Sequence, residues 1–415
     1  MRAVFVGRFQ PFHKGHLNAI KYILKKQKGG IFIVIGSIER FLERDNPFFF
    51  KERKEMVLRA LRESKIKNFK IFGLPDFFDD KIWASKVLAV TGLKPLDTLV
   101  FSRDPWTMKS FEKIGVRVKP QPFFFNKLSA TLVRKKICRQ EKWEHLLPKS
   151  VSVYLKEIRA GQRLKFLAVP PEKRIVGFIR EKIKEAGAKG GIVGVSGGVD
   201  SAVAAVLAKQ ALGNRCRFLS INFDRGSLAE NISLLNKKLG GRIKILSLRS
   251  PYDCLLRRFP PGNKTARGNL KSRLIMATLY YFANFYNLLV IGTTNRSEEE
   301  VGYFTKFGDG AVDIEPISHL YKTDVLEMAK RLGVPEEIIR TKPSAGFWQG
   351  QTDEKELGVS YEQLDKILRL LVQGFKEEEI SFLTDISKKK VRDVIQRKKK
   401  NTHKLLPPAR IQYVN

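Results

Sequence analysis

The sequence predicts two doubly wound α/β domains in tandem, each built around a parallel sheet. Short apolar stretches of strand length alternate with longer stretches that carry apolar residues at helical spacing, and this alternation is typical of parallel sheets covered by helices. The alternation weakens around residues 161–172 and then starts again. A chain of 415 residues is long enough for two or three domains of about 100–200 residues each.

The first expected domain covers residues 1–168. Its helices are recognised by apolar residues that recur every three or four positions, as at Leu17, Ile20 and Leu24. Its strands are short, continuous apolar stretches, and the first of them ends in glycine. The expected elements are, in order, a strand over 3–7, a helix over 16–26, a strand over 31–36, a helix over 51–62 and a strand over 99–102.

The second expected domain covers residues 169–415 and begins at a hinge. Pro170 and Pro171 mark the hinge, because two consecutive prolines disfavour a helix through that point. The expected elements after it are a helix over 174–186, a strand over 191–195, an alanine-rich helix over 201–212 and strands over 218–221, 243–247 and 288–292. Sheets of this kind bind ligands at the carboxyl ends of their strands, so the residues that follow the strands are the candidate site residues.

The chain is strongly basic. Lysine and arginine number 78 against 42 acidic residues, which gives a formal net charge of +36, and basic runs stand at residues 388–390 and 397–400. Such a surface attracts polyanions such as RNA without selecting among them. Non-specific polyanion binding and a general basic bias with no specific partner both remain open.

The composition argues against a membrane protein and against a disulfide or zinc framework. No apolar stretch reaches the length of about 18 residues that spans a bilayer. The first residues form a strand-like stretch rather than a signal peptide, so a soluble cytoplasmic protein is expected. The three cysteines, Cys138, Cys216 and Cys254, lack the spacing of metal ligands and are expected to be reduced thiols.

The first motif lies between the first strand and the first helix. It reads Gly7-Arg8-Phe9-Gln10-Pro11-Phe12-His13-Lys14-Gly15-His16. The two histidines are three residues apart near a helix N-terminus, where both rings and the free backbone N–H groups can face one anion. A histidine pair of this spacing is more commonly a surface feature, but the strand before it and the helix after it favour a phosphate site.

The second motif is glycine-rich and has the same strand-to-helix setting. It reads Gly194-Val195-Ser196-Gly197-Gly198-Val199-Asp200-Ser201. Successive glycines expose backbone N–H groups to an anion, and the two serines add hydroxyl donors. Asp200 would repel a phosphate by itself, so its presence indicates a bridging cation. The alternative, a flexible glycine turn, does not explain the serines and the aspartate.

The first motif resembles the nucleotide-binding turn of the HxGH nucleotidyltransferases, specifically the archaeal-type nicotinamide-nucleotide adenylyltransferases. The likeness extends over about residues 1–168 and includes Asn46-Pro47-Phe48 with Glu52-Arg53, Ile82-Trp83, Ser129-Ala130-Thr131-Leu132-Val133-Arg134 and Lys142-Trp143-Glu144-His145-Leu146-Leu147-Pro148. The resemblance implies that His13, His16 and Arg134 bind the ATP phosphates and act in catalysis. It implies further ATP contacts at Gly7, Arg8, Phe9, Ser129 and Thr131. Trp83 either stacks on the pyridine ring or is a buried core residue.

The implied reaction of the first domain is attack by a mononucleotide phosphate on the α-phosphorus of ATP, assisted by Mg²⁺. The sequence departs from this family at Ser102-Arg103-Asp104, where the family commonly has SGN, and at residues 49–53, where it commonly has TAGER. The first departure leaves the choice between nicotinate and nicotinamide mononucleotide open.

The second motif resembles the signature of the ATP pyrophosphatases, and the segments downstream of it resemble ammonia-dependent NAD synthetase over about residues 172–408. These segments include residues 292–298, 302–310, 342–345 and 403–404. The resemblance implies ATP contacts at Gly194, Ser196, Gly197, Gly198, Ser201, Thr293, Lys322 and Ser344. Asp200 and Glu298 are the implied Mg²⁺ ligands, and Asp200 and Lys306 the implied catalytic residues. The implied contacts to deamido-NAD are Arg273, Asp313, His403 and Lys404.

The two resemblances together imply NAD biosynthesis on two Rossmann-like sheets, with ATP as co-substrate of both steps. The second step is amidation of deamido-NAD by ammonia, which arrives free or from a separate protein, since no glutaminase domain is visible. A homo-oligomer, a dimer through the synthetase domain, is also implied. One departure is Ile275, where the synthetase family usually has an arginine. Two alternatives remain: an ATP pyrophosphatase that modifies tRNA or nucleotides, and an RNA-binding protein on the same scaffold.

Overall fold

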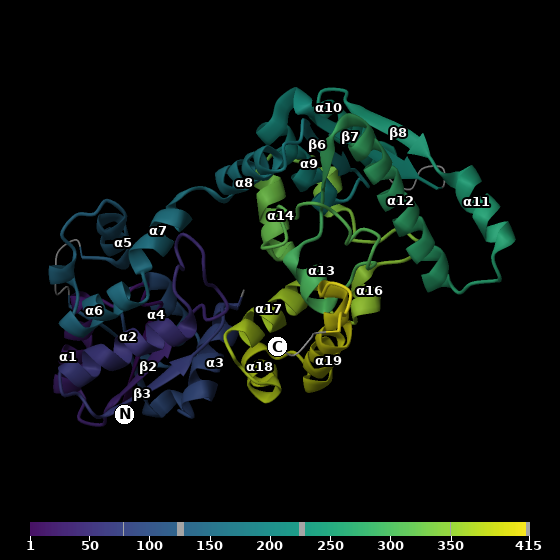
Figure 1. Cartoon of the computed structure of the whole chain (residues 1–415). Helices are drawn as coiled ribbons and strands as arrows, with labels where there is room; N and C mark the ends of the chain where they lie inside the picture. Colours follow the sequence, from purple (N-terminus) through teal and green to yellow (C-terminus); the bar gives the residue numbers. More distant parts are fainter. Residues whose placement is uncertain (78, 123–127, 224–228, 349, 412–415) are drawn as a thin grey trace. The chain divides into compact units, whose positions relative to one another are not determined.

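The computed structural model describes residues 1–77, 79–122, 128–223, 229–348 and 350–411 of the chain (Figure 1). Contacts divide the chain into two compact units. The first unit combines Met1–Pro170 with Arg369–Ile386, and the second combines Pro171–Leu368 with Ser387–Asn415. Each unit contains one parallel sheet with helices around it, so the predicted fold class is confirmed. A domain boundary between residues 168 and 169 stays a prediction.

The first unit is built on a five-stranded parallel sheet with the strand order β3-β2-β1-β4-β5. Its strands are β1 (Arg2–Gly7), β2 (Ile31–Ile35), β3 (Phe69–Gly73), β4 (Thr98–Ser102) and β5 (Arg117–Pro120). The chain reverses its direction across the sheet between β1 and β4, the kind of switch point where doubly wound sheets bind their ligands. The residues that follow β1, β2 and β4 therefore gather at one edge of the sheet.

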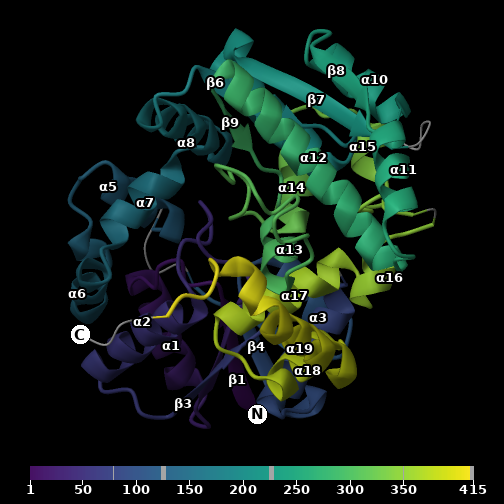
Figure 2. The ribbon, with the colours of Figure 1, turned by 45° about the vertical axis from the view of Figure 1, so that its right-hand side comes forward.

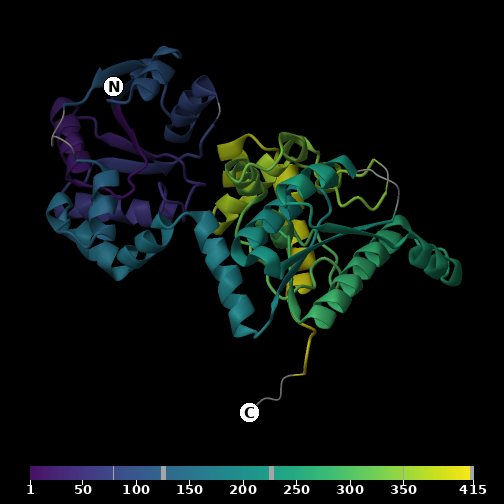
Figure 3. The same ribbon diagram turned by 90° about the horizontal axis from the view of Figure 1, so that it is seen from above.

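Helices cover both faces of this sheet (Figure 3). Helices α1 and α2 bury their apolar sides against β1, β2 and β4 in one large core cluster, while α4 packs against β4 and β5 and contacts α3. The helices of this unit are α1 (Lys14–Lys26), α2 (Phe50–Glu63), α3 (Asp80–Thr91), α4 (Pro105–Glu112), α5 (Ala130–Cys138), α6 (Lys149–Glu157), α7 (Ala160–Ala168) and α18 (Glu377–Thr384), with short 3₁₀ turns at Pro95–Asp97 and Glu144–Leu146.

The second unit is built on a four-stranded parallel sheet with the order β8-β7-β6-β9. Its strands are β6 (Gly190–Gly194), β7 (Cys216–Asn222), β8 (Ile243–Ser247) and β9 (Leu288–Ile291). The strand order reverses between β6 and β9, so the glycine-rich turn that follows β6 lies beside the switch point.

Two core clusters lie on the two faces of this second sheet. Helices α8 (Pro171–Glu185), α9 (Val199–Leu212) and α14 (Lys322–Arg331) contribute to the larger cluster, and the long α12 (Lys264–Tyr286) covers the other face (Figure 2). The remaining helices are α10 (Ala229–Lys238), α11 (Arg249–Arg258), α13 (Arg296–Val301), α15 (Glu336–Arg340), α16 (Asp353–Leu357), α17 (Tyr361–Val372) and α19 (Lys388–Leu405), with a 3₁₀ turn at Gly213–Arg215. Over the described part of the chain, none of these helices combines the length and apolar character required to cross a bilayer.

Candidate active sites

The first candidate site begins at the turn between β1 and α1. A Cβ atom on Gly7 would lie 2.7 Å from the ring of Phe9, so only glycine permits this close approach. Phe9 has a left-handed backbone with φ of 52° and only 2% of its surface exposed. Its ring packs against the rings of Phe12 and His16 at 5.5 and 5.0 Å. The Phe9 side chain thus belongs to the core, and its backbone is the part that faces the turn.

The two histidines of the turn come together. The rings of His13 and His16 stack with centroids 3.6 Å apart. The backbone N–H of His13 donates to Nδ1 of His16 at 3.2 Å, and the N–H of His16 donates to Nδ1 of His13 at 3.4 Å. Because each Nδ1 is an acceptor, a neutral ring carries its proton on Nε2.

Burial decides the charge of this pair. Loss of solvent lowers the pKa of His13 to about 4. Burial also lowers the pKa of His16 well below its ordinary value, and repulsion from His13 adds to the effect. Near neutral pH the pair therefore offers two neutral Nε2–H donors to an anion rather than two positive charges.

Arg134 joins the same turn from α5. Ser129 caps this helix, since its hydroxyl accepts the N–H of Leu132 at 3.1 Å. The Arg134 guanidinium donates to the backbone carbonyl of Gln10 at 2.8 Å and to the Asp45 carboxylate at 2.9 Å, with the Thr131 hydroxyl at 3.4 Å. The predicted residues at the start of α5 thus lie at the histidine turn.

Arg53 belongs to the first resemblance, but the sequence indicated no role for it. Its guanidinium is completely buried in α2 and donates to three backbone carbonyls: Arg8 at 3.1 Å, Gly36 at 2.7 Å and Ser37 at 3.0 Å. Burial lowers its pKa to about 10, which leaves the group charged near neutral pH. Arg53 therefore ties the segment after β1 to the segment after β2. The exposed side chain of Arg8 remains available to a ligand.

The structure distinguishes two tryptophans of the first unit. Trp83 is 5% exposed and packs against the rings of Trp106 and Phe111 at 4.9 and 5.5 Å, so it has the surroundings of a core residue. Trp106 is 47% exposed. The Asp104 carboxylate caps α4 by accepting the N–H and the hydroxyl of Thr107 at 2.8 and 2.7 Å. The departure at residue 104 thus has a local structural role.

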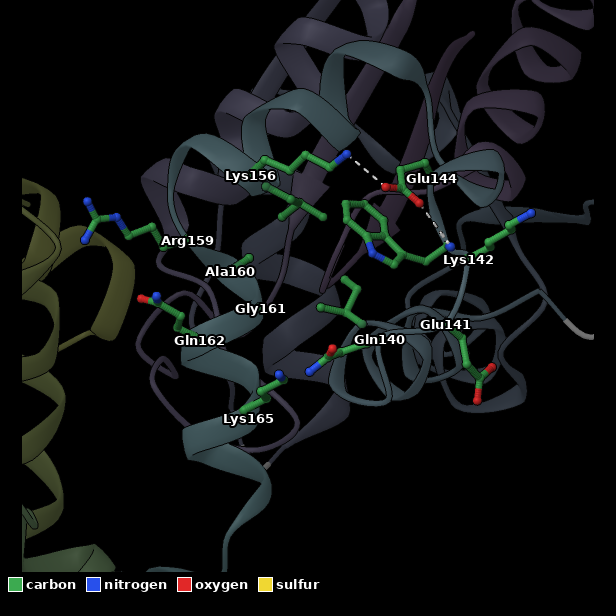
Figure 4. Close-up of a pocket in the computed structure, with 13 residues that line it drawn as sticks. Gln140, Glu141, Lys142, Glu144, Lys156, Arg159, Ala160, Gly161, Gln162 and Lys165 are labelled. Carbon is green, nitrogen blue, oxygen red and sulfur yellow. Dashed lines mark hydrogen bonds and ion pairs between the residues drawn. The ribbon is translucent and has the colours of Figure 1, made fainter.

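A separate cavity of about 600 Å³ lies among α5, α6, α7 and the segment between α5 and α6 (Figure 4). Over it the Lys156 ammonium reaches the Glu144 carboxylate at 2.9 Å, while the Arg159 side chain points away from this pair. None of the residues predicted to bind ATP or a pyridine nucleotide lines this cavity.

The second candidate site begins at the glycine-rich turn between β6 and α9. Gly197 has φ of 87°, which favours glycine, and its carbonyl accepts the Asn231 amide at 3.0 Å. The hydroxyls of Ser196 and Ser201 lie 3.1 Å apart, and the N–H of Gly198 donates to the Ser196 hydroxyl at 3.3 Å. The turn is therefore held in shape by its own serines and by α10.

A buried charge cluster lies beside this turn. Lys322, at the start of α14 and 2% exposed, donates to the carboxylate of Asp200 and to that of Glu298 at 3.4 Å. Asn295 donates to Asp200 at 2.9 Å. Burial opposes the charge of Lys322, but the two carboxylates outweigh it and raise its pKa. Burial and repulsion from Asp200 raise the pKa of Glu298 to about 8, against the opposing effect of Lys322.

Tyr361 extends this cluster, although no sequence signal pointed to it. Its hydroxyl lies 3.2 Å from Glu298 and 3.0 Å from Asp353, so it can donate to either carboxylate. The Tyr303 hydroxyl lies 3.1 Å from the other oxygen of Asp353 and 2.8 Å from Glu356. The acidic residues around Lys322 are thus held by phenolic hydroxyls in place of further cations.

The predicted ligand contacts of the second unit occupy several places. Thr293 follows β9, and Ser344 is exposed, with its hydroxyl accepting the N–H of Gly346 at 3.1 Å. Ile275 lies partly buried on the apolar cluster between α12 and the sheet, where an arginine would lose its hydration. Asp313 accepts the Tyr280 hydroxyl at 3.1 Å and the N–H of Val290 at 2.7 Å, so both its oxygens are already engaged.

The remaining predicted contacts surround the end of α19. Lys306 donates to the carbonyls of His403 and Leu406 at 2.7 and 2.9 Å. Lys404 donates to the carbonyls of Gly302 and Phe304 at 2.7 and 2.9 Å, and Arg273 reaches the carbonyl of Lys306 at 3.4 Å. These contacts link Arg273, Lys306 and His403, and Lys404 lies on the same helix end as His403.

The residues of the second unit fit a magnesium ion. Among the described residues, no group of three or more histidine, cysteine and acidic side chains forms a complete metal site. Mg²⁺ commonly uses only one or two carboxylates and completes its shell with phosphates and water. Burial and repulsion from Asp200 raise the pKa of Glu298 despite Lys322, and a divalent cation beside the two carboxylates would favour their charged forms.

Two different protein families match the two parts of the chain. A family model described as NAD synthase matches residues 172–408, and one described as cytidylyltransferase-like matches residues 4–136. Among relatives, the NH(3)-dependent NAD(+) synthetase of Methanosarcina acetivorans is 41% identical over 57% of this chain and 95% of that protein. The corresponding synthetase of Methanocaldococcus jannaschii is 46% identical over 57% of this chain and 94% of that protein.

Solved structures agree with this similarity. The NMN synthetase from Francisella tularensis is 33% identical, with a TM-score of 0.52, and the match covers 59% of this chain and 98% of that one. The NH3-dependent NAD synthetase from Campylobacter jejuni is 28% identical with a TM-score of 0.50, over 58% and 97% of the two chains. Both predicted resemblances, a nucleotidyltransferase joined to an NAD synthetase, are confirmed. The chain belongs to the NAD synthase family.

Proposed function

We propose that the chain makes NAD by two consecutive reactions, one in each unit. The first unit transfers an adenylyl group from ATP to nicotinate mononucleotide, or to nicotinamide mononucleotide, and releases pyrophosphate. The second unit amidates deamido-NAD with ammonia and a second ATP, giving NAD, AMP and pyrophosphate. The observation that supports this proposal is that each sheet has, beside its switch point, a strand-to-helix turn of the kind that binds phosphate.

In the first unit, catalysis consists mainly of positioning the two substrates and stabilising the charge of the phosphates. A phosphate oxygen of the mononucleotide attacks the α-phosphorus of ATP, and the bond to the pyrophosphate oxygen breaks. His13 and His16 donate from Nε2 to the phosphates, and Arg134 supplies the fixed positive charge beside them. Ser129, Thr131 and the backbone of the turn complete the ATP site.

In the second unit the nicotinate carboxylate attacks the α-phosphorus of ATP, pyrophosphate leaves, and ammonia then displaces AMP. Gly194, Ser196, Gly197, Gly198 and Ser201 bind phosphate, together with Thr293, Lys322 and Ser344. Asp200 and Glu298 would hold Mg²⁺, which supplies charge neutralisation when bound. Lys306, with Arg273, His403, Lys404 and Asp313, contacts deamido-NAD. A homo-oligomer formed through this unit is part of the proposal.

The order of the two reactions has a second candidate. The 33% identity to the NMN synthetase from Francisella tularensis favours amidation of nicotinate mononucleotide before adenylyl transfer. In that order the first unit uses nicotinamide mononucleotide and makes NAD directly. The two orders differ only in the intermediate: deamido-NAD in one and nicotinamide mononucleotide in the other.

The test is a time course with nicotinate mononucleotide, ATP, Mg²⁺ and ammonium, with products separated by chromatography. Deamido-NAD that appears first and then declines as NAD forms supports the proposed order. Nicotinamide mononucleotide as the transient species supports the second candidate. A reaction that forms no pyridine dinucleotide from either mononucleotide contradicts both.

A further inference from the structure

A segment from the NAD synthase part of the chain packs within the first unit. Residues 369–386 lie inside the region that the NAD synthase model matches, yet their contacts group them with residues 1–170. Gln373 is 3% exposed and uses both ends of its amide. Its Oε1 accepts the N–H of Phe50 at 3.0 Å, and its Nε2 donates to the carbonyl of Ile38 at 2.8 Å.

These two partners stand at the two ends of one loop. Phe50 is the first residue of α2, and its N–H has no acceptor within the helix. Phe49, the residue before it, makes no side-chain cap, so Gln373 supplies the cap from 323 residues away. Ile38 lies shortly after β2. Gln373 therefore fixes both ends of the loop formed by residues 38–50.

Neighbouring side chains hold the segment at further points. Arg369 lies 3.6 Å from the Glu43 carboxylate, within the same loop. The ring of Phe375 packs against the ring of Phe50 with centroids 5.5 Å apart. Lys86 on α3 donates to the carbonyl of Phe382 at 2.8 Å and forms an ion pair with Asp385. The contact is thus built from apolar, polar and charged groups.

The middle of the loop reaches the histidine turn. Asp45 accepts the Arg134 guanidinium at 2.9 Å. The N–H of Phe48 donates to the Gln10 side chain at 3.1 Å, and the backbone carbonyl of Gln10 accepts Arg134 at 2.8 Å. The loop therefore positions Arg134 by two routes, and Gln373 secures the ends of that loop.

We infer that Gln373 is a positioning residue for adenylyl transfer and that residues 369–386 complete the nucleotidyltransferase unit. This inference rests on the proposed adenylyl-transfer function of the first unit. Residues 369–386 belong to the region that the NAD synthase model matches, and they would stabilise the 38–50 loop in the region that the cytidylyltransferase-like model matches. Gln373 acts through the 38–50 loop on Arg134 and does not touch the substrate.

The test compares Gln373→Leu in the full chain with the wild type and with Gln363→Leu as the matched control. Gln363 lies on α17, whose last residue directly precedes Gln373, and its amide oxygen accepts the Lys390 ammonium at 3.3 Å. In Gln373→Leu we expect kcat for adenylyl transfer to fall about tenfold, which is about 1.4 kcal/mol. Amidation of supplied deamido-NAD stays within twofold of the wild type. Hydrogen exchange speeds up in residues 38–50.

Several outcomes overturn the inference. Unchanged kcat with a lowered melting temperature would show that Gln373 only stabilises the fold, and an equal loss of both activities would show general damage. A similar loss in Gln363→Leu would also contradict it. If the wild type performs no adenylyl transfer, the proposed function fails on its own. Hydrogen exchange in residues 38–50 then tests the loop contact alone: faster exchange in Gln373→Leu shows that Gln373 anchors this loop, and unchanged exchange rejects that part of the inference as well.

Discussion

The two strand-to-helix turns, which are the two proposed phosphate sites, differ in the groups that they offer to a ligand. In the first unit, the rings of His13 and His16 are stacked and neutral near pH 7, and Arg134 donates to the backbone of the same turn. In the second unit, Lys322 is buried between the carboxylates of Asp200 and Glu298. One turn therefore depends on hydrogen-bond donors and the other on a balance of charges.

This difference determines which substitutions each site tolerates. A neutral donor can be lost without leaving a buried charge behind, so its loss should affect transfer more than folding. A buried lysine that balances two carboxylates cannot be removed without leaving them uncompensated. Substitutions in the two turns should therefore separate the two activities and also separate activity from stability.

The largest effect is expected for Lys322→Met. Removing the ammonium leaves Asp200 and Glu298 buried without their cation, which typically costs about 3–5 kcal/mol of folding free energy. We expect amidation of supplied deamido-NAD to fall by about a thousandfold or more, because the charge that stabilises the phosphates is lost as well. Product formation and thermal unfolding measure the two effects. Lys330→Met, an exposed lysine on the same helix, is the control. Retained amidation in Lys322→Met would contradict the assigned site.

The next largest effect is expected for His16→Ala. Loss of one Nε2–H donor to the ATP phosphates should lower kcat for adenylyl transfer about a hundredfold. Amidation of supplied deamido-NAD should be unchanged, since the second unit keeps its own turn. The exposed His145 of the same unit provides the control, His145→Ala. An equal fall of both activities would show that the two turns are not independent sites.

The pH dependence of stability sharpens the comparison. The pKa of His13 is lowered by burial from 6.5 to about 4 in the folded chain, so the unfolded chain binds the proton first as the pH falls. The free energy of unfolding is therefore not reduced by His13 above about pH 6.5. It falls as the pH drops toward 4, by up to about 3 kcal/mol, because the unfolded chain binds a proton that the folded chain does not. Chemical denaturation at pH 7.5 and 4.5 measures it. His13→Asn should unfold with a smaller difference between the two pH values, and an equal difference would show that His13 is not the cause.

The smallest effect is expected for Asn231→Ala. This change removes the hydrogen bond to the Gly197 carbonyl, which is worth about 1 kcal/mol. We expect KM for ATP in the amidation reaction to rise about fivefold with kcat little changed. The exposed Asn214 offers the matched control, Asn214→Ala. A change in kcat without a change in KM would indicate a role other than shaping the turn.

The sequence predicted the two turns well because their signal is local. A strand, a glycine and a helix start are adjacent in the chain, so the relation of His13 to His16 and of Ser196 to Ser201 follows from a few residues. The predicted strands and helices agree with the structure within about two or three residues at their ends. The strands β3 and β5 were missed because both are partly exposed and lack a continuous apolar stretch. The helix α7 was missed where the pattern weakens.

The contacts that join distant segments could not be predicted. Arg53 and Tyr361 are placed by tertiary packing, and nothing in their sequence neighbourhood indicates that Arg53 binds three carbonyls or that Tyr361 donates to Glu298. Gln373 meets its partners across more than 300 residues. For Trp83 the sequence left two interpretations, and its packing against Trp106 and Phe111 is that of a core residue. Its predicted contact with the pyridine ring stays a prediction.

The central claim is that the two turns are separate active sites for consecutive reactions, and mixing two variants tests it most directly. His16→Ala and Asp200→Asn are each supplied with nicotinate mononucleotide, ATP, Mg²⁺ and ammonium, singly and mixed in equal amounts. We predict that each variant alone forms NAD at no more than about a hundredth of the wild-type rate. Asp200→Asn alone should accumulate deamido-NAD, and the mixture should form NAD much faster than either variant. A mixture that forms no NAD, or a single variant that forms it at the wild-type rate, would contradict the account.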